Sequence, residues 1–367
     1  MKSLATLGNE LYSAKTSIPF VGKRRIWYLI AVVVIAGSAA LLALVGLTPG
    51  IDFKGGSEIT VTGLSSPSER PANEVLSKED MTAGSSVTTM GSSSVRVQTS
   101  QLSKERLDSL AGELATAYKT DASNVSATTV GPTWSSDVTK KAARGLVLFF
   151  IFVGLLIWAY FRTWKMAAAA LLALCHDVVV TVGIYALSGF EVTPATIIGV
   201  LTILGYSLYD TVVVFDKIRE NTDGFEAQSR STYAELANLA VNQTFIRSIN
   251  TSVVGVLPVA SLLVVGAFIL GAGTLRDIAL TLFIGMIAGT LSSIFLATPL
   301  LVDLRSREKA IKDQADKVAA ARQQRREEAG DDVEELAKID AAPAASPVTP
   351  GHHLGVAAQP KRKKKRR

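Results

Sequence analysis

The sequence predicts a mainly α polytopic membrane protein, in which a six-helix transmembrane bundle carries one small α+β, ferredoxin-like extracytoplasmic domain. The first observation is hydropathy, since 48% of the 367 residues are hydrophobic and the mean hydropathy is +0.31. The second is distribution, because the apolar residues fall into six long runs, and roughly 20 apolar residues are enough to span a bilayer. The third is a mixed pattern of strands and helices in the long loop after the first run.

The six runs define the predicted membrane spans. The first run follows three basic residues, as in a signal peptide, but it is longer than the roughly 7–15 residues of a secretory apolar core and no A-x-A-like cleavage site follows it. It is therefore interpreted as a retained helix. Short connections after the second, third and fifth spans make those helices antiparallel to their successors. The predicted spans are residues 26–47, 142–161, 166–187, 192–215, 247–270 and 278–302.

Lysine and arginine are concentrated in the loops of one side, which the positive-inside rule assigns to the cytoplasm. The N-terminal segment 1–25, the turn after the second span and the loop after the fourth all contain several of them. The short turns of the opposite side contain one, Arg276. Both termini are therefore predicted to be cytoplasmic. Lys140, Lys141 and Arg144 lie on the other side, but they end a long loop, and long loops cross largely regardless of charge.

The loop of residues 48–141 is the only sizeable segment that this orientation places outside the membrane. It contains four short strand patterns and two helical patterns, the second of them an apolar face that begins at Leu102 and ends at Tyr118. The resulting order β-α-β-β-α-β is that of a ferredoxin-like domain. The strands are expected at 58–61, 87–89, 95–98 and 125–130, and the first helix at 73–80.

The segment 303–367 after the last span is highly charged. Residues 305 to about 340 are rich in Ala, Lys, Arg and Glu and predict a helix that continues from the membrane, before a linker and a tail that is disordered by composition. The last seven residues are all basic, so the rest of the chain carries 6 − 7 = −1. This tail could contact anionic lipid headgroups or ribosomal RNA. The alternative is a solvated tail that only reinforces the cytoplasmic orientation.

Signatures of an enzyme are absent from the sequence. It has no P-loop, no G-x-S-x-G and no His, Cys or carboxylate cluster with metal-ligand spacing. Its one cysteine, Cys175, excludes a disulfide or a thiolate metal site within the chain. We therefore expect no enzymatic activity, no cofactor, no metal and no nucleotide. Any work that the protein performs must come from an ion gradient or from a partner.

Charged residues inside the predicted spans are the candidates for function, because each costs roughly 2.5–3.5 kcal/mol to insert. Asp210 lies about 9 Å inside the cytoplasmic end of the fourth span, at the rise of an α-helix. It shares one helix face with Tyr206, and Arg247 opens the fifth span with Thr251 one turn further on. The two spans are antiparallel, so Asp210 and Arg247 lie at comparable depth and could pair.

A buried carboxylate that alternates between contact with an arginine and separation from it would bind and release protons with each change of conformation. The alternative is a static ion pair that fixes helix packing. His176 and Asp177, in the middle of the third span, are also charged or titratable. As adjacent residues they point about 100° apart and are not expected to face each other. They could serve a proton relay, or one of them could simply anchor the helix.

Several stretches of the sequence resemble one family. A stretch just outside the first span resembles the G-I-D-F-x-G-G motif shared by SecD and SecF proteins, and a long one in the fourth span is similar to the SecF signature G-Y-S-x-x-D-T-x-V-x-x-D-R-I-R-E-N. The others resemble segments that close the outer domain or begin later helices. The matching stretches are Gly50-Ile-Asp-Phe-Lys-Gly-Gly56, Val130-Gly-Pro132, Gly205-Tyr-Ser-Leu-Tyr-Asp-Thr-Val-Val-Val-Phe-Asp-Lys-Ile-Arg-Glu-Asn221, Asn242-Gln-Thr-Phe-Ile-Arg247 and Leu275-Arg-Asp277.

The resemblance to the SecD/SecF family implies a proton-coupled membrane protein of the resistance-nodulation-division type. It implies the SecF side of a SecD–SecF complex beside the SecYEG channel, in the bacterial cytoplasmic (inner) membrane, where the proton motive force assists late steps of preprotein translocation. The proton-relay Asp of the family falls on Asp210 and its helix-five Arg on Arg247. The G-G motif assigns a structural role to Asp52, Gly55 and Gly56.

The sequence departs from the family pattern at two places in this long signature. Lys217 replaces a common Arg and keeps its charge, whereas Tyr209 stands where Asn is frequent and alters the hydrogen bonding next to Asp210. Tyr206, Thr251, His176 and Asp177 are candidates for groups that support the relay.

Two other functions compete with protein export. One is a drug or lipid efflux pump of the same superfamily, which needs outer domains large enough to enclose a substrate. The single outer loop is close to the lower end of the size of a domain and can barely enclose anything alone. The other is a membrane scaffold that transports nothing, in which Asp210 and Arg247 would matter only for assembly.

Cysteine labelling tests the predicted topology. A cysteine in place of Ser92 should react with membrane-impermeant reagents in intact cells, because the loop that contains it lies outside. Cysteines in place of Ser229 and Ser346 should react only after the cells are permeabilised. Labelling at Ser229 in intact cells would contradict the six-span arrangement.

Overall fold

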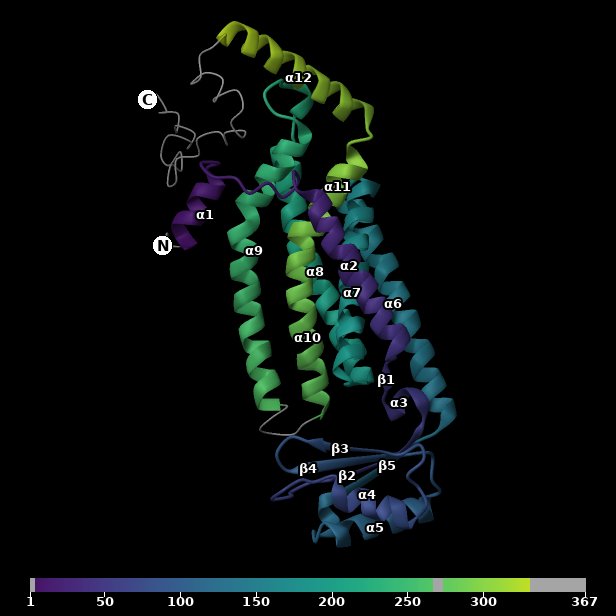
Figure 1. Cartoon of the computed structure of the whole chain (residues 1–367). Helices are drawn as coiled ribbons and strands as arrows, with labels where there is room; N and C mark the ends of the chain where they lie inside the picture. The colour runs from purple at the N-terminus through teal and green to yellow at the C-terminus, as the bar shows by residue number, and fades with distance from the viewer. Residues whose placement is uncertain (1–3, 267–272, 331–367) are drawn as a thin grey trace, which may run out of the picture. The chain divides into compact units, whose positions relative to one another are not determined.

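The computed structural model describes residues 4–266 and 273–330, which Figure 1 draws in colour. The chain divides into two compact units. The membrane unit comprises Lys23–Phe215 and Arg247–Leu304, and the second unit comprises Met1–Gly22, Asp216–Ile246 and Arg305–Arg367. The predicted basic tail, residues 361–367, and Ser346 lie outside the described residues.

Six helices of the described chain are long and apolar enough to cross a membrane, as the sequence predicts. The side chains that they turn outward include large apolar groups, such as Leu44, Phe152 and Val254, which are 85%, 65% and 69% exposed. Such a surface is stable in lipid and not in water. The helices are α2 (Arg24–Leu44), α6 (Pro132–Phe161), α7 (Trp164–Ser188), α8 (Pro194–Asn221), α9 (Tyr233–Val264) and α10 (Gly273–Ser292).

Several helices extend beyond the predicted spans, because an α-helix satisfies its own backbone groups in water as well as in lipid. Helix α6 already begins at Pro132, a residue that suits the first turn of a helix. Helix α9 begins at Tyr233, after a reciprocal cap in which the Thr232 and Glu235 side chains bind each other's backbone N–H groups. Hydropathy detects only the apolar part of such helices.

The last membrane helix does not continue into the charged segment as a single helix. Helix α10 passes into a π-helical turn, Ser293–Ala297, and then into α11, Thr298–Arg305. A turn separates α11 from α12, Lys309–Ala329. The helix expected from residue 305 is therefore present as a separate element from Lys309 to Ala329, and the part predicted beyond residue 330 lies outside the described residues.

The outer domain has the predicted β-α-β-β-α-β order. Its sheet is antiparallel throughout with the strand order β3-β4-β2-β5, the arrangement of a ferredoxin-like fold. Two helices cover one face of this sheet (Figure 1). The elements are β2 (Gly56–Val61), α4 (Arg70–Lys78), β3 (Ser86–Met90), β4 (Ser94–Thr99), α5 (Lys104–Ala117) and β5 (Val125–Val130).

The alternation of side chains along the strands gives the sheet one apolar and one polar face. Ile59 and Val61 of β2 are buried with Val95 and Val97 of β4, and the core also contains Leu76, Leu107, Leu110 and Leu114 from the helices. The residues that alternate with them along the strands, among them Glu58, Arg96 and Gln98, point to the opposite face, because side chains in a strand alternate with a period of two.

The second unit joins the N-terminal segment and α12 to the chain between α8 and α9. The Asn242 and Asn238 side chains accept backbone N–H bonds from Ile18 and Val21, at 2.8 and 3.0 Å. From α12, the Arg322 guanidinium donates two hydrogen bonds to the Glu235 carboxylate, at 2.9 and 2.8 Å. The parts of this unit are thus held by polar bonds between segments far apart in sequence.

The two glycines of the motif lie where the chain enters the outer sheet, after the short helix α3 (Ile51–Lys54). Gly55 and Gly56 have φ angles of +76° and +138°, which disfavour residues with a side chain. A Cβ atom at Gly56 would lie 2.6 Å from the Thr99 carbonyl oxygen. The Thr99 carbonyl therefore leaves no room for a side chain at Gly56, and the position is not a free hinge.

Replacing Gly56 with alanine should destabilise the outer domain by about 1–3 kcal/mol, the usual cost of overpacking. Limited proteolysis of membranes should show faster cleavage of residues 56–130. The matched control is Gly112→Ala on the exposed side of α5, where a Cβ meets nothing within 4 Å. That change should be neutral or stabilising. Equal protease resistance of the two variants would mean that Gly56 is only a flexible connection.

Candidate functional site

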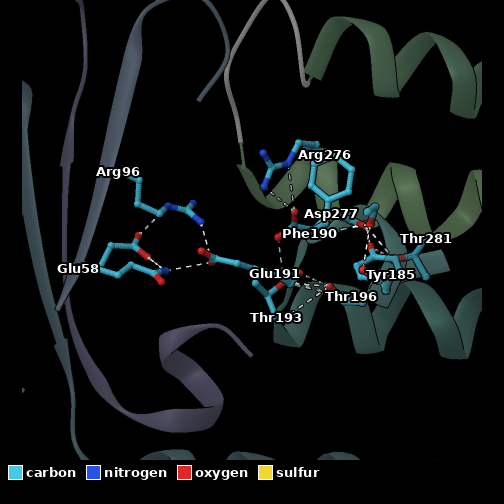
Figure 2. Close-up of polar contacts among 12 residues, drawn as sticks. Glu58, Arg96, Tyr185, Phe190, Glu191, Thr193, Thr196, Arg276, Asp277 and Thr281 are labelled. Atoms are coloured by element: carbon cyan, nitrogen blue, oxygen red, sulfur yellow. Dashed lines mark hydrogen bonds and ion pairs between the residues drawn. The ribbon is translucent and has the colours of Figure 1, made fainter. Parts of the chain in front are cut away.

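Polar and charged side chains gather at two levels of the membrane unit. The inner cluster consists of Asp177, Asp210 and the hydroxyl groups around them, deep among the helices. The outer cluster includes Asp277 and Glu191 and adjoins the outer domain, as Figure 2 shows. Both clusters contain buried carboxylates, which persist inside proteins only when other groups bind them.

Asp210 of α8 is 4% exposed and receives hydroxyl groups from two other elements. Ser248 of α9 donates to one carboxylate oxygen at 2.8 Å, and Ser293 donates to the other at 3.2 Å. Ser293 begins the π-helical turn after α10. Such turns insert one extra residue and often occur at functional sites. The carboxylate is therefore bound at both oxygens by groups that can also accept a hydrogen bond.

Arg247 does not pair with Asp210, which corrects the pairing considered from the sequence. Its Nη2 atom donates to the Tyr209 hydroxyl at 3.3 Å, and the residue is exposed. The physical reason is rotation about the helix axis. Adjacent residues of α9 point about 100° apart, and Ser248 takes the inward position. Helix depth can be estimated from sequence position, but the direction of each side chain depends on packing.

The predicted supporting residues Tyr206 and Thr251 do come together. The Tyr206 hydroxyl donates to the backbone carbonyl of Thr251 at 2.9 Å, and Thr251 donates to the carbonyl of Arg247 at 2.9 Å. Together with the contact between Tyr209 and Arg247, these bonds join α8 to α9 one turn apart. Tyr209 is the position that departs from the family pattern, and here it supplies the partner of the arginine.

Asp177 of α7 is 1% exposed and binds two side chains. Ser207 of α8 donates to Oδ2 at 2.7 Å, and His176 Nδ1 lies 3.2 Å from Oδ1. The expectation that His176 and Asp177 do not face each other is wrong, because rotation of both side chains brings their ends together. Ser207 and Asp210 are three residues apart on α8 and share a face. The third and fourth spans are therefore joined through Asp177 and Ser207, one turn of α8 away from Asp210.

Helix α10 approaches α8 closely at this level. A Cβ atom at Gly289 would lie 2.6 Å from the Ser207 Cβ, and one at Gly285 would lie 2.5 Å from Ile203 Cγ1. Small residues allow such close contact between membrane helices. The glycines of α10 thus have a packing role beside the polar residues.

The outer cluster is built around Asp277, which is 3% exposed at the start of α10. Its carboxylate receives the Arg276 guanidinium at 3.3 Å and the Thr193 hydroxyl at 3.1 Å. Tyr185 donates to the Asp277 carbonyl at 3.0 Å and shares a hydrogen bond of 2.6 Å with Thr281 (Figure 2). From the sequence, Leu275-Arg-Asp277 is recognised only as a family motif. Opposite charges side by side at the start of an apolar span were the available signal for this site.

The same cluster extends to the outer domain through Glu191, in the turn between α7 and α8. Arg96 Nη1 and Gln98 Nε2 lie 3.2 and 3.0 Å from the same Glu191 oxygen. Burial raises the pKa of the nearby Asp52 carboxyl above its ordinary value; the Arg96 guanidinium opposes this shift and the Glu191 carboxylate adds to it. The motif residue Asp52 is thus electrostatically linked to this cluster.

The fold and these clusters define a class of protein: a polytopic membrane protein with buried carboxylates between its helices and a ferredoxin-like outer domain. Comparison with known families then identifies it further. The family described as protein export membrane protein SecD/SecF, C-terminal, matches residues 111–307, and the SecD/SecF GG motif matches residues 40–62. The chain belongs to the SecD/SecF family, and the resemblance inferred from its motifs is confirmed.

Relatives and solved structures agree with this assignment. The chain is 44% identical over 324 residues to the protein translocase subunit SecF of Streptomyces coelicolor, covering 88% of this chain and 86% of that one. It is 42% identical over 330 residues to the SecF subunit of Mycobacterium tuberculosis, covering 86% and 73%. The crystal structure of SecDF, a translocon-associated membrane protein from Thermus thermophilus, is similar with a TM-score of 0.69 and 31% identity. That match covers 80% of this chain but only 39% of the SecDF chain.

Ser248→Ala should reduce the stability of the purified protein by about 1–3 kcal/mol, because the buried Asp210 carboxylate loses a donor. Thermal unfolding followed by tryptophan fluorescence measures this. The matched control is Ser261→Ala on the same helix, since the Ser261 hydroxyl is exposed and binds the Leu257 carbonyl of its own helix. That variant should stay within about 0.5 kcal/mol of the parent. Equal melting temperatures for both variants would show that Asp210 does not depend on Ser248.

Proposed function

We propose that the chain acts as the SecF subunit of a Sec protein translocase. In this proposal it associates with SecD beside the SecYEG channel and uses the proton motive force to assist late steps of preprotein translocation. The observation that carries the proposal is the buried Asp210, bound by two serine hydroxyls between helices, in a chain whose relatives are named protein translocase subunits. The activity makes and breaks no covalent bond, so no enzyme chemistry is required.

The surroundings of Asp210 suit a group that gains and loses a proton. When ionised, the carboxylate accepts from both serines. When protonated, it becomes a donor itself, and one of the two hydroxyls must turn to accept. Ser248 and Ser293 belong to α9 and to the π-helical turn, so each proton alters contacts between three elements. Proton binding is thereby linked to helix packing.

Arg247 gives α9 a second way to meet Asp210. It precedes Ser248, and a rotation of α9 by about 100° would exchange the serine for the arginine at the carboxylate. Arginine stays charged at all relevant pH values. In the proposed cycle, one state has Asp210 bound by serines with Arg247 held by Tyr209, and the other pairs Asp210 with Arg247. His176 and Asp177 support the relay through Ser207.

The energy available to such a relay is sufficient for mechanical work. A proton crossing a potential of 100 mV releases about 2.3 kcal/mol, which is enough to shift a conformational equilibrium by more than tenfold. The proposal places residues 48–141 outside the cell membrane and residues 1–25 and 303–367 in the cytoplasm. Anionic lipid is a further proposed partner, which the basic tail would contact.

Asp210→Asn separates a relay from a static support. Asparagine keeps the shape and the ability to bind both serines, but it cannot take up a proton. We expect normal abundance and normal association with SecD, with loss of the gradient-stimulated part of export. Translocation of a reporter preprotein into inverted vesicles, with and without a proton gradient, measures this in a strain that lacks the parent copy.

Three further variants make the result decisive. Arg247→Lys should be partly active and Arg247→Met inactive, since the charge is needed and the fork of the guanidinium helps. Asp108→Asn, an exposed change on α5, is the control and should leave export unchanged. Full gradient-stimulated export by Asp210→Asn would remove this residue from the mechanism. Loss of the SecD complex in the same variant would instead favour the scaffold.

A further inference from the structure

The outer domain contacts the membrane part of the chain through a group of polar side chains, called here the polar seam. These contacts are separate from the covalent connections of the chain. The seam consists of Glu58, Arg96 and Gln98 on the polar face of the outer sheet, and Glu191 in the turn between α7 and α8 (Figure 2). We define the polar seam by these four residues. Glu58 and Arg96 lie on adjacent strands of the outer sheet.

Arg96 is the centre of the seam. Its side chain is 14% exposed and lies between two carboxylates: Nη1 is 3.2 Å from Glu191 and Nε is 3.4 Å from Glu58. Gln98 Nε2 donates to both carboxylates, at 3.0 Å each. Without the guanidinium, the two carboxylates would face each other with like charge in a site largely shielded from water. The two carboxylates belong to different parts of the protein: Glu58 lies in the outer domain itself, and Glu191 lies in the turn between the membrane helices α7 and α8.

Backbone contacts across the seam are few. The strand β1 (Thr48–Pro49) pairs in parallel with β6 (Glu191–Val192), and the Gly50 N–H donates to the Val192 carbonyl at 2.9 Å. A ladder of two residues is marginal by itself. The side chains of the polar seam therefore provide specific binding where the backbone provides little.

Glu191 is placed where it must move with the helices of the inner cluster. It lies three residues after Ser188, where α7 ends, and three residues before Pro194, where α8 begins. Helix α7 carries Asp177 and helix α8 carries Asp210. From Pro194 to Asp210 the distance along the helix is about 24 Å. Because α-helices are stiff over this length, a displacement at the inner cluster reaches the turn.

We propose that Glu191 is a positioning residue that fastens the outer domain to the α7–α8 turn through Arg96 and Gln98, so that the outer domain follows movements of the two helices. The inference rests on the proposed function for its purpose, since the movement would come from proton exchange at Asp210. The fastening itself depends only on the contacts described above. The cation that Glu191 binds is thus the Arg96 guanidinium, which belongs to the outer domain.

Spin-label distances test the fastening directly. Labels on cysteines at Asp108 of α5 and Leu187 of α7, both exposed, report the separation of the outer domain from the membrane helices; Cys175 is first replaced by alanine. The full-length protein with SecD is measured in lipid nanodiscs by double electron–electron resonance. Glu191→Ala removes the contact between the two parts. Glu58→Ala is the matched control, because it removes a carboxylate from the same guanidinium on the outer domain's own side.

The expected result is a broadened and longer distance distribution for Glu191→Ala and an unchanged one for Glu58→Ala. An unchanged distribution in Glu191→Ala overturns the proposal. An equal change in both variants also overturns it, because the effect would then come from the charge balance around Arg96 and not from the bond across the seam.

Export measurements separate this inference from the proposed function. In sealed proteoliposomes under a proton gradient, the label distance in the parent protein should shift, and Glu191→Ala should abolish that shift together with most of the gradient-stimulated export. A purely structural role would leave the gradient response intact. If the parent shows no gradient-stimulated export, the proposed function fails, while the resting distances still decide the fastening. If Glu191→Ala loosens the seam but keeps full gradient-stimulated export, the role in coupling is refuted.

Discussion

The burial of carboxylates among apolar membrane helices is the constraint on which the rest of the structure depends. A carboxylate placed there has to find its donors within the protein. Asp210 finds them in Ser248 and Ser293, and Asp177 finds them in Ser207 and His176. These bonds hold the inward faces of α7, α8 and α9 together, and α10 comes close to α8 beside them, at Gly289. The polar interior is thus a cause of the packing as well as its product.

The six spans and the outer domain could be predicted because each depends on a local pattern. A run of apolar residues must form a helix in lipid. The alternation of apolar and polar residues in the outer loop predicts the strands β2 to β5. The depth of Asp210 followed from the helical rise. Its partners did not, because Arg247 and Ser248 lie at the same depth and only the packing of α9 decides which of them points inward. The π-helical turn that presents Ser293 also has no signature in hydropathy.

The outer cluster was missed for a different reason. Glu191 and Arg96 are 95 residues apart in sequence, and no local pattern connects the short turn that contains one with the strand that contains the other. Charges in turns outside the membrane are ordinary, so nothing in the composition distinguishes them. Only the fold shows that the polar face of the outer sheet and the α7–α8 turn share one guanidinium. Asp277 lies within a recognised motif, yet its partner Thr193 is 84 residues earlier, just before α8.

The two clusters occupy different positions on the same pair of helices, and this arrangement has a mechanical consequence. Helices α7 and α8 carry a buried carboxylate each and are joined at their outer ends by a turn of few residues. In the proposed mechanism, a change in how the carboxylates are bound would alter the packing of these helices, and the turn could absorb little of that change because it is short. Arg96 and Gln98 hold that turn to a rigid sheet with a packed apolar core. In the proposed coupling, a small rearrangement of hydrogen bonds inside the membrane would thereby displace a whole domain outside it, without a bond of the domain itself being broken.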